Sequence, residues 1–557
     1  MINQELAKIF YEIANILEFK DIQWKPQAYR KAARTLENLQ QPVTEIYKKG
    51  SLKALDELPG IGKNISKKIE EYIKTKNIKE YQKLKKQTPF NLQKLMDISS
   101  LGPKRIKTLY QKLKIRNIQD LKRAIQQHKI QKLPGFKEKL EKDIQEGLTL
   151  TRKKRMLLSE ALDLSNYIIQ KLKPFALKIS PAGSLRRMDE TTGDIDLLAT
   201  SKQPQKLMQT FTSLPEIKKI LAKGPTKSII VLKNNIQVDI RVVPNECYGS
   251  ALQYFTGNKQ HNITLRKIAI KKHYKLSEYG LFHKNKRIAT TEKEIYSKLN
   301  IPYSEPEIRE NKYEFQKFPK LISLQDIKGD LHIHTNYSDG SSTIQEILQK
   351  ARSLNYQYIA ITDHSKSRKI SRGLSIKQLQ KQIKEIDKIN SFKILKGAEV
   401  DILRNGSLDY PNSILKQLDI VIAAVHSSFK LSKIEQTNRI LKALQNKHVN
   451  ILAHPTGRLI QRRNPYPIDL QKIYEFAKDN NKILEINSYP ERLDLNAINI
   501  KEALQNKVKL VISTDAHSTQ GLNYMILGVS QAKKALATKK DIVNTLNFRQ
   551  LRKFIKD

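Results

Sequence analysis

Hydrophobic positions change their spacing along the chain, and each spacing predicts a different architecture. Near the N-terminus Leu6, Ile9, Phe10, Ile13 and Leu17 recur every three or four residues, which predicts an amphipathic helix. Helical spacing with short connectors continues to about residue 150. Helical and strand signals then alternate to about residue 244, beginning with a long helix expected over 152–173. The pattern predicts an all-α N-terminal region followed by an α+β region.

A third pattern begins after residues 300–327, which are polar, contain several prolines and are expected to form a linker. Short apolar runs then recur with helical spacing between them, beginning near residues 330, 358, 394, 420, 451, 483 and 510. Seven strands that alternate with helices predict a parallel (β/α) barrel of seven units. Functional residues of such a barrel belong at the C-terminal ends of its strands.

Three glycine turns lie between helical runs in the N-terminal region. The first contains Gly60 and Gly62, the second Gly102 and Lys104, and the third Gly135. Serine replaces the first glycine of the second copy, and lysine replaces the second glycine of the third. The repeat predicts helix-hairpin-helix turns, whose backbone amides face a DNA phosphate. Ordinary packing of helices across a turn is the alternative.

The net charge of the chain favours a polyanionic partner. Lysine and arginine total 102 against 55 acidic residues among 557, a formal net charge of +47. Nucleic acid is the leading partner and an anionic membrane surface the lesser one, although an AT-rich genome also enriches lysine. No apolar run approaches the roughly 20 residues of a spanning helix, and the first residues lack a signal peptide, so a cytoplasmic protein is expected. Cys247 is the single cysteine, which excludes disulfides within the chain and thiolate clusters.

The α+β region contains residues suited to nucleotidyl transfer. Asp194 and Asp196 are two apart, so in a strand both carboxylates point to the same face and converge on divalent ions. Gly183-Ser184 precedes them as a turn that brings backbone amides close to a phosphate. Asp239 lies in a second apolar strand, after a hairpin turn at Asn234-Asn235, and is a third candidate ligand because a buried carboxylate requires a cation.

These residues resemble the palm of family X DNA polymerases, and Tyr254-Phe255-Thr256-Gly257 resembles the thumb motif of that family. The resemblance covers about residues 1–315 and implies a two-metal mechanism in which Asp194, Asp196 and Asp239 hold Mg²⁺ or Mn²⁺. It further implies contacts to the incoming nucleotide from Gly183, Ser184, Arg186, Arg187, Gly193, Tyr254, Phe255, Gly257 and Asn262. Contacts to DNA are expected from Lys25, Arg241 and Arg266 together with the hairpin residues.

Lys68 matches the place of a lysine that removes 5′-deoxyribose phosphate in animal members of the family. Such a nucleophile needs a depressed pKa, which neighbouring cations could supply. However, Asn64 replaces another lysine of that site. A phosphate contact without lyase chemistry is the alternative.

The barrel half is rich in metal-binding side chains. Six of the 11 histidines follow the predicted strands, and three carboxylates join them: His332, His334, Asp339, His364, Glu399, His426, His454, Asp515 and His517. Mixed imidazole and carboxylate ligands suit two or three Zn²⁺, Mn²⁺ or Fe²⁺ ions. The set resembles that of the polymerase and histidinol phosphatase (PHP) domain, which implies phosphoester hydrolysis assisted by metal ions. Joined to a polymerase, it implies 3′-5′ exonuclease activity, with cleavage at abasic sites or 3′-phosphate removal as further possibilities.

We therefore expect a family X polymerase that fills short gaps during base excision repair and processes 3′ ends. Its substrates would be deoxynucleoside triphosphates and gapped or nicked DNA, and it would act as a monomer. The expected divisions are a lyase-like helical domain, fingers, palm, thumb, linker and PHP domain: 1–85, 86–150, 151–245, 246–315, 316–328 and 329–557. The alternatives are a phosphatase of small metabolites with a degenerate nucleotidyltransferase, and a non-catalytic DNA-binding scaffold.

Overall fold

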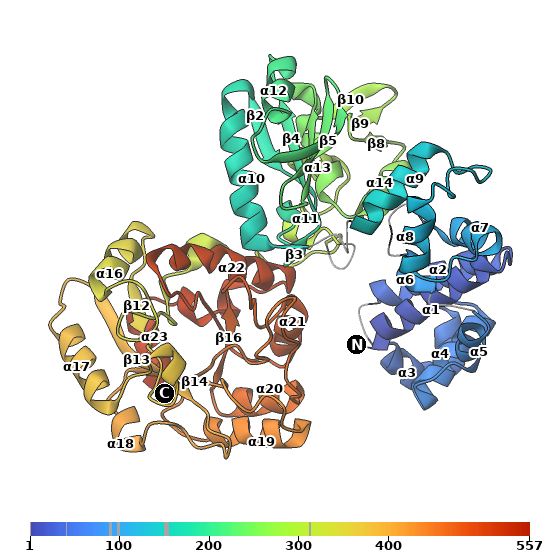
Figure 1. Cartoon of the computed structure of the whole chain (residues 1–557). Helices are drawn as coiled ribbons and strands as arrows, with labels where there is room; N and C mark the ends of the chain where they lie inside the picture. The colour runs from blue at the N-terminus through green and yellow to red at the C-terminus, as the bar shows by residue number, and fades with distance from the viewer. Residues whose placement is uncertain are drawn as a thin grey trace. The chain divides into compact units, whose positions relative to one another are not determined.

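A computed structural model describes nearly the whole chain as two compact units. The first comprises 1–154 with 233–236, and the second 155–232 with 237–557. The described residues are 2–39, 42–88, 92–96, 98, 101–149, 155–310 and 314–556. Figure 1 gives the helices and strands of both units. No helix in the described part of the chain is long and apolar enough to cross a membrane.

The first unit is all-α, as its hydrophobic spacing predicts. Four of the five predicted apolar positions in the first helix are buried, and Ile9 is partly buried against the same core. That core extends without interruption from Leu6 to Ile144. The helices are α1 (Ile2–Phe19), α2 (Lys25–Asn38), α3 (Val43–Asp56), α4 (Lys63–Thr75), α5 (Lys79–Lys86), α6 (Leu92–Met96), α7 (Pro103–Leu113), α8 (Ile118–Gln126) and α9 (Glu138–Thr149).

The glycine turns lie between helices, as predicted. Gly60 has a φ of 81° and Gly135 a φ of 79°, in the left-handed region that side chains rarely adopt. A β-carbon on Gly60 would also approach Lys31 Cγ to 2.6 Å. Gly62 and Gly102 precede the first residues of α4 and α7. Ser99 and Ser100 of the second turn lie outside the described residues.

The first part of the second unit is a five-stranded mixed sheet. Its order is β2 (Lys178–Pro181), β4 (Asp194–Thr200), β7 (Gln237–Val242), β6 (Lys227–Leu232) and β5 (Ile217–Lys223). The β4–β7 pair is parallel and the others are antiparallel, including the predicted β6–β7 hairpin. The neighbouring elements are β1 (Met156–Leu157), α10 (Leu158–Leu172), α11 (Gly183–Arg186), β3 (Thr191–Thr192) and α12 (Pro204–Phe211).

The helix expected over 152–173 begins later than predicted. Residues 152–154 lie outside the described part of the chain, and α10 begins at Leu158. Arg155 precedes β1, and its guanidinium donates to the Thr191 hydroxyl across the β1–β3 pair at 2.7 Å. Arg155 therefore belongs to a two-stranded connection and not to the first turn of a helix.

A small helical and β subdomain follows the mixed sheet. It contains α13 (Tyr248–Thr256), α14 (Lys259–Lys271), β8 (Lys275–Ser277), β9 (Gly280–His283), β10 (Lys286–Ala289) and α15 (Glu292–Lys298), around a core of its own. The expected linker does not begin at residue 300, because Arg309 is fully buried and ion-pairs with Glu292. The expected linker also packs against the barrel near its C-terminal end, since Leu321 and Ile322 are buried and Ile322 belongs to the barrel core.

The C-terminal region is the predicted seven-stranded parallel barrel. Its strands pair in chain order: β11 (Gly329–Asp330), β12 (Tyr358–Ile361), β13 (Lys393–Asp401), β14 (Ile420–Ala424), β15 (Ile451–Leu452), β16 (Ile483–Asn487) and β17 (Leu510–Ser513). A parallel bridge between Ile333 and Ala516 joins the segments that follow the first and last strands. The barrel is therefore nearly closed.

Helices cover the outside of the barrel (Figure 1). They are α16 (Ile344–Ser353), α17 (Ile376–Asp387), α18 (Asn412–Leu415), α19 (Lys433–Leu444), α20 (Leu470–Asp479), α21 (Ala497–Gln505) and α22 (Met525–Lys534). The last helix, α23 (Phe548–Lys556), packs instead against the inner core. Short 3₁₀ turns complete the second unit: η1 (Lys173–Phe175), η2 (Asn245–Cys247), η3 (Pro306–Ile308), η4 (Leu324–Asp326), η5 (Lys369–Ser371), η6 (Thr519–Tyr524), η7 (Lys539–Asp541) and η8 (Val543–Thr545). Strand residues alternate between a core shared with these helices and an inner core that includes Leu551 of α23. The apolar strand residues fill these two cores, and polar residues follow at the C-terminal ends of the strands.

Replacing Arg309 with methionine should loosen the segment after α15. The change leaves the largely buried Glu292 carboxylate without one of its two arginine partners, and breaking a buried pair costs about 3 to 5 kcal/mol. Faster hydrogen exchange in residues 292–310 would report the loss. Lys298→Met, at an exposed position of α15, is the matched control and should exchange like the parent chain. Unchanged exchange in Arg309→Met would contradict the assignment of this segment to the folded subdomain.

Candidate active sites

Three carboxylates meet on neighbouring strands of the mixed sheet. The parallel register of β4 and β7 places Asp196 directly beside Asp239, with Asp194 two residues away on β4. Ile195, Val238 and Ile240 between them are fully buried, so the acidic side chains share the opposite face. Burial and the charges of Asp194 and Asp239 raise the pKa of Asp196 to about 6. Divalent cations would relieve this repulsion, and carboxylate oxygens are the ligands that Mg²⁺ prefers, so the residues present fit a two-metal site.

Gly183 lies against this cluster and has no room for a side chain. Its φ is 58°, and a β-carbon would lie 2.2 Å from Asp196 Oδ2. Ser184 donates to the Thr192 hydroxyl at 2.6 Å, because Thr192 donates its own proton to the Asp194 carbonyl. The turn is therefore tied to the strand that carries the carboxylates. Gly193 has ordinary space around it.

The two predicted arginines are used differently. Arg186 makes a bidentate pair with Glu292 at 2.8 and 2.6 Å and also donates to Thr256, so it joins the sheet to the following subdomain. These partners occupy the Arg186 guanidinium, and its contact to a nucleotide stays a prediction. Arg187 donates to the Thr256 carbonyl at 2.9 Å and to Asp189 at 2.8 Å, while its buried Nε has no partner.

The Tyr254–Gly257 motif ends α13 and is organised by Asn262. The Asn262 amide donates to the carbonyls of Tyr254 and Gly257, at 2.6 and 3.1 Å. A β-carbon on Gly257 would lie 2.9 Å from Asn262 Oδ1. The Phe255 ring lies 4.9 Å from the Arg241 guanidinium, which places Arg241 beside the motif. Arg266 is exposed, one helical turn after Asn262.

In the first unit, Lys68 has acidic and phenolic neighbours and not the cations that a lyase lysine was expected to need. Its ammonium lies 2.8 Å from Glu80 Oε2 and near Tyr29. Burial would lower the pKa of Lys68, but Glu80 and Tyr29 raise it above its usual value. These neighbours therefore do not supply the depressed pKa that a lyase nucleophile needs. Lys25 and Lys104 are exposed at the first turns of α2 and α7.

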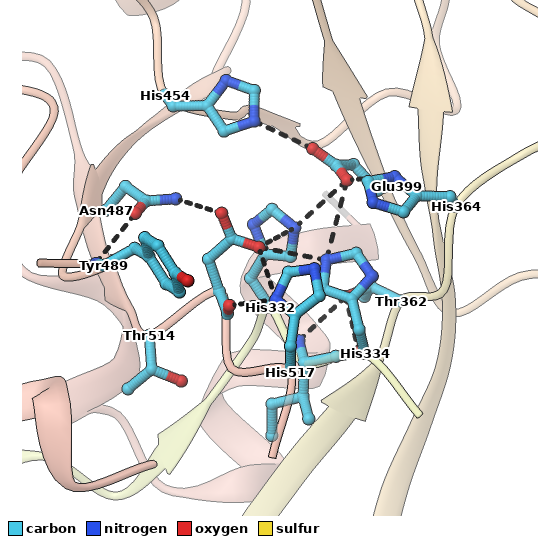
Figure 2. Close-up of polar contacts among 12 residues, drawn as sticks. His332, His334, Thr362, His364, Glu399, His454, Asn487, Tyr489, Thr514 and His517 are labelled. Atoms are coloured by element: carbon cyan, nitrogen blue, oxygen red, sulfur yellow. Dashed lines mark hydrogen bonds and ion pairs between the residues drawn. The ribbon is translucent and has the colours of Figure 1, made fainter. Parts of the chain in front are cut away.

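The nine predicted metal-binding residues of the barrel gather at one end of its sheet. Most are buried, and Figure 2 shows the His332, His334 and His517 rings and the Glu399 carboxylate directed toward a common space. Three groups have ligand atoms within 4.8 Å of one another: His334, Asp339, His364 and His517; His332, His334 and Asp515; and His364, Glu399 and His426. His454 completes the set through Glu399, at 3.0 Å. His454 and Asp515 have positive φ angles, which marks local strain at these positions.

The orientation of these atoms fits metal ions better than direct pairing. His364 Nδ1 lies 2.7 Å from Glu399 Oε2, yet neither atom has a hydrogen-bond partner of acceptable geometry. The same holds for His332 Nε2 and for both ring nitrogens of His334, all buried. Buried polar atoms without partners are costly, so a cation at their common focus would stabilise the arrangement. Burial and the neighbouring imidazoles lower the pKa of His334 to about 4, whereas the carboxylates around His332, His364 and His517 raise theirs.

Carboxylates behind the ligands orient two of the imidazoles. Glu485 Oε1 accepts from His332 Nδ1 at 2.7 Å, and Asp401 Oδ1 accepts from His426 Nδ1 at 2.6 Å. Each contact fixes one ring nitrogen and leaves Nε2 for the site. Sequence reasoning missed Glu485 and Asp401 as parts of the site. The only local signal was a carboxylate inside the apolar runs of β16 and β13.

A cavity of about 180 Å³ opens beside the nine residues. Arg368, Tyr489 and Arg492 line it together with His364, Glu399, His426, Asp339, Asp515 and His517. Arg368 Nε is buried without a partner, and Arg492 Nε lies 3.5 Å from Asp515 Oδ2. Two arginines facing a metal-binding cluster form a site suited to a phosphoester.

Comparison with known proteins agrees with this division of chemistry. Residues 1–78 match a helix-hairpin-helix domain, 92–149 a helix-hairpin-helix tandem, 251–310 a DNA polymerase beta thumb and 330–489 a PHP domain. The DNA polymerase/3′-5′ exonuclease PolX of Bacillus subtilis is 38% identical over 573 aligned residues, which cover 100% of both chains. The chain belongs to the PolX family. The fold expected from the sequence is confirmed by these matches.

The PHP half has a second group of relatives. A probable phosphatase of Thermoanaerobacter sp. (strain X514) is 35% identical over 227 residues, which cover 39% of this chain and 89% of the relative. A probable phosphatase of Clostridium acetobutylicum is 33% identical over 199 residues, covering 34% and 78%. Barrels of this type therefore also occur without the polymerase half.

Glu485→Gln should weaken metal binding in the barrel without removing a direct ligand. The amide would orient His332 less strongly, and loss of such a partner typically reduces metal affinity by about 10- to 100-fold. Titration of the metal-free protein with Mn²⁺ would measure the change. Glu475→Gln, on the exposed face of α20, is the matched control and should bind as the parent does. Equal affinity in Glu485→Gln would contradict an orienting role.

Lys68 should not form a Schiff base at pH 7. A raised pKa keeps the amine protonated, and only the neutral amine attacks an aldehyde. Borohydride trapping on DNA with a 5′-deoxyribose phosphate would compare the parent with Lys68→Ala. We expect no difference between them. A cross-link that disappears only in Lys68→Ala would show lyase chemistry and overturn this expectation.

Proposed function

We propose that the chain extends DNA 3′ ends in the mixed sheet and shortens them in the barrel. The observation that carries the proposal is the register of Asp196 against Asp239, beside Asp194 and a glycine turn without room for a side chain. Membership of the PolX family supports the same assignment, since the Bacillus subtilis relative is named as a polymerase and a 3′-5′ exonuclease.

In the polymerase site, Asp194 and Asp196 would hold two Mg²⁺ or Mn²⁺ ions, and Asp239 would bind the ion nearer the primer. When bound, the ions neutralise charge on the phosphates and lower the pKa of the attacking 3′-hydroxyl. Arg187 and the Gly183-Ser184 turn would hold the triphosphate, together with Gly193 further along the chain. Because the residues are preorganised on paired strands, little reorganisation is needed when the phosphates arrive.

The remaining nucleotide and DNA contacts lie around this centre. Tyr254, Phe255 and Gly257 would border the sugar, with Asn262 fixing their backbone. Arg241 and Arg266 would contact DNA in the same unit. We propose that Gly60, Gly62, Gly102, Lys104 and Gly135 of the first unit, with Lys25, bind phosphates of gapped or nicked duplex DNA. A net charge of +47 supports a polyanionic substrate.

In the barrel, the nine imidazole and carboxylate ligands would hold two or three Mn²⁺, Zn²⁺ or Fe²⁺ ions. Bound ions would activate water and stabilise the leaving oxygen of a phosphoester. Arg368 and Arg492 would orient the phosphate, and the cavity admits one terminal phosphoester more readily than a duplex. We therefore propose removal of nucleotides from 3′ ends, with abasic-site cleavage and 3′-phosphate removal as related reactions of the same centre.

Together these activities suit gap filling in base excision repair by a monomer acting on chromosomal DNA in the cytoplasm. A phosphatase of small metabolites is the competing proposal, which the probable phosphatases among the relatives favour for the barrel alone. The mixed sheet argues against it for the whole chain, because its three converging carboxylates would have no use there.

Separate substitutions should abolish separate activities on a labelled one-nucleotide gapped duplex. Asp194→Ala should lower the rate of primer extension by at least about 100-fold, because a proposed metal ligand is lost. His334→Ala should stop Mn²⁺-dependent shortening and leave extension intact. One gel, with and without nucleotides, would measure both.

His448→Ala is the control for the barrel, since this histidine is not among the proposed metal ligands. It should retain both activities. Loss of both activities in Asp194→Ala or in His334→Ala would contradict two independent centres. Wild-type behaviour of both variants would instead support a DNA-binding scaffold.

A further inference from the structure

The loop that carries Arg187 is held by the barrel. It runs from the end of α11 at Arg186 to β3 at Thr191. Within it, Met188 has a φ of 55°, and Asp189 N–H donates to the Ser184 carbonyl at 3.1 Å. A residue other than glycine keeps a left-handed backbone conformation only where its surroundings impose it. Besides these bonds within the turn, residues 188–190 are held by side chains from elsewhere in the second unit.

Asp189 bridges the polymerase arginine and a barrel lysine. One carboxylate oxygen accepts from Arg187 at 2.8 Å, and the other accepts from Lys534 Nζ at 2.5 Å. Lys534 ends α22 of the barrel and also donates to Glu310 at 3.0 Å. Its side chain is only 10% exposed. Burial disfavours its charge, but Glu310 and Asp189 outweigh burial and raise the pKa of Lys534, so it is charged at neutral pH.

The residues on either side of Asp189 also contact the barrel. Gln531 of α22 donates to the Met188 carbonyl at 3.3 Å. Arg458 makes a bidentate pair with Glu190, at 2.7 and 3.1 Å, and lies four residues after the metal-ligand candidate His454. Three consecutive residues of the polymerase loop are thus each held by a barrel side chain. A loop that served only as a connection would not need this arrangement.

We propose that Lys534 is a positioning residue for nucleotide binding: through Asp189 it holds the Arg187 guanidinium in the orientation that receives the triphosphate. Arg187 has two fixed partners, the Thr256 carbonyl and Asp189, and Asp189 is in turn held by Lys534 of the barrel. Without Lys534, the Asp189 carboxylate would be free to rotate with Arg187 toward solvent. The barrel would then contribute to the affinity of the polymerase for nucleotide, apart from its own hydrolytic chemistry.

The test is steady-state gap filling by the full chain, with KM for nucleotide and kcat measured separately. This inference rests on the proposed polymerase function. Lys534→Met should raise KM about five- to tenfold, at the low end of the range typical of coupling between sites, and change kcat by less than about twofold. Lys534→Arg, which keeps the charge, should restore most of the affinity. Lys540→Met removes an exposed barrel lysine and is the matched control, expected to behave like the parent.

Shortening of a single-stranded primer in Mn²⁺ reports whether the barrel of each variant is intact. If Lys534→Met loses this activity, Glu190→Gln decides, because it removes the Arg458 contact from the polymerase side and should show the same rise in KM. An unchanged KM in a variant with an intact barrel would overturn the inference and leave the polymerase function standing. Absence of extension by the parent chain would overturn the proposed function itself.

Discussion

In both catalytic regions, ionisable side chains are held close together on neighbouring parallel strands: carboxylates in the mixed sheet, and imidazoles with carboxylates in the barrel. Asp196 and Asp239 are direct neighbours in the β4–β7 register, and Glu399 is surrounded by imidazoles at the end of the barrel. Burial would raise the pKa of Glu399, yet the imidazoles hold it well below its usual range. The apolar strands beneath must be rigid enough to maintain these arrangements, so the two cores serve the sites as well as stability.

This constraint explains why the supporting residues are so specific. Gly183 has no alternative because Asp196 occupies the space of its β-carbon. Glu485 accepts a hydrogen bond from one ring nitrogen of His332, and Asp401 from one of His426. The other nitrogen of each ring is thereby directed toward the cluster of candidate ligands. In the same way, Glu292 receives both Arg186 and Arg309, which ties the end of the small subdomain back to the mixed sheet. The charged groups among these are buried or largely buried, and each would be costly to leave unpaired.

The contacts of residues 188–190 add a connection between the two catalytic regions of the second unit. They consist of two charged pairs and one amide contact. Charged pairs with low exposure specify geometry more than they add affinity. Such contacts suit the proposed role in orienting Arg187, because small displacements of a group that holds a phosphate would have large effects on nucleotidyl transfer.

The sequence alone predicted most of the element types, the turns and the candidate ligands, because these depend on local spacing. Period-2 spacing placed Asp194 and Asp196 on one face, and the recurrence of apolar runs ending in histidine or carboxylate predicted the barrel and its nine candidate ligands. The helical N-terminal region followed equally from its apolar spacing and glycine turns.

Only the tertiary structure decided which distant residues meet. Glu485 is 153 residues from His332, Glu292 is 106 from Arg186, and Lys534 is 345 from Asp189. No local pattern distinguishes these side chains from solvated ones, so their partners could not be named from the sequence. Charge and hydrogen-bonding groups acquire their function from their partners, and partners far apart in the chain are brought together only by folding.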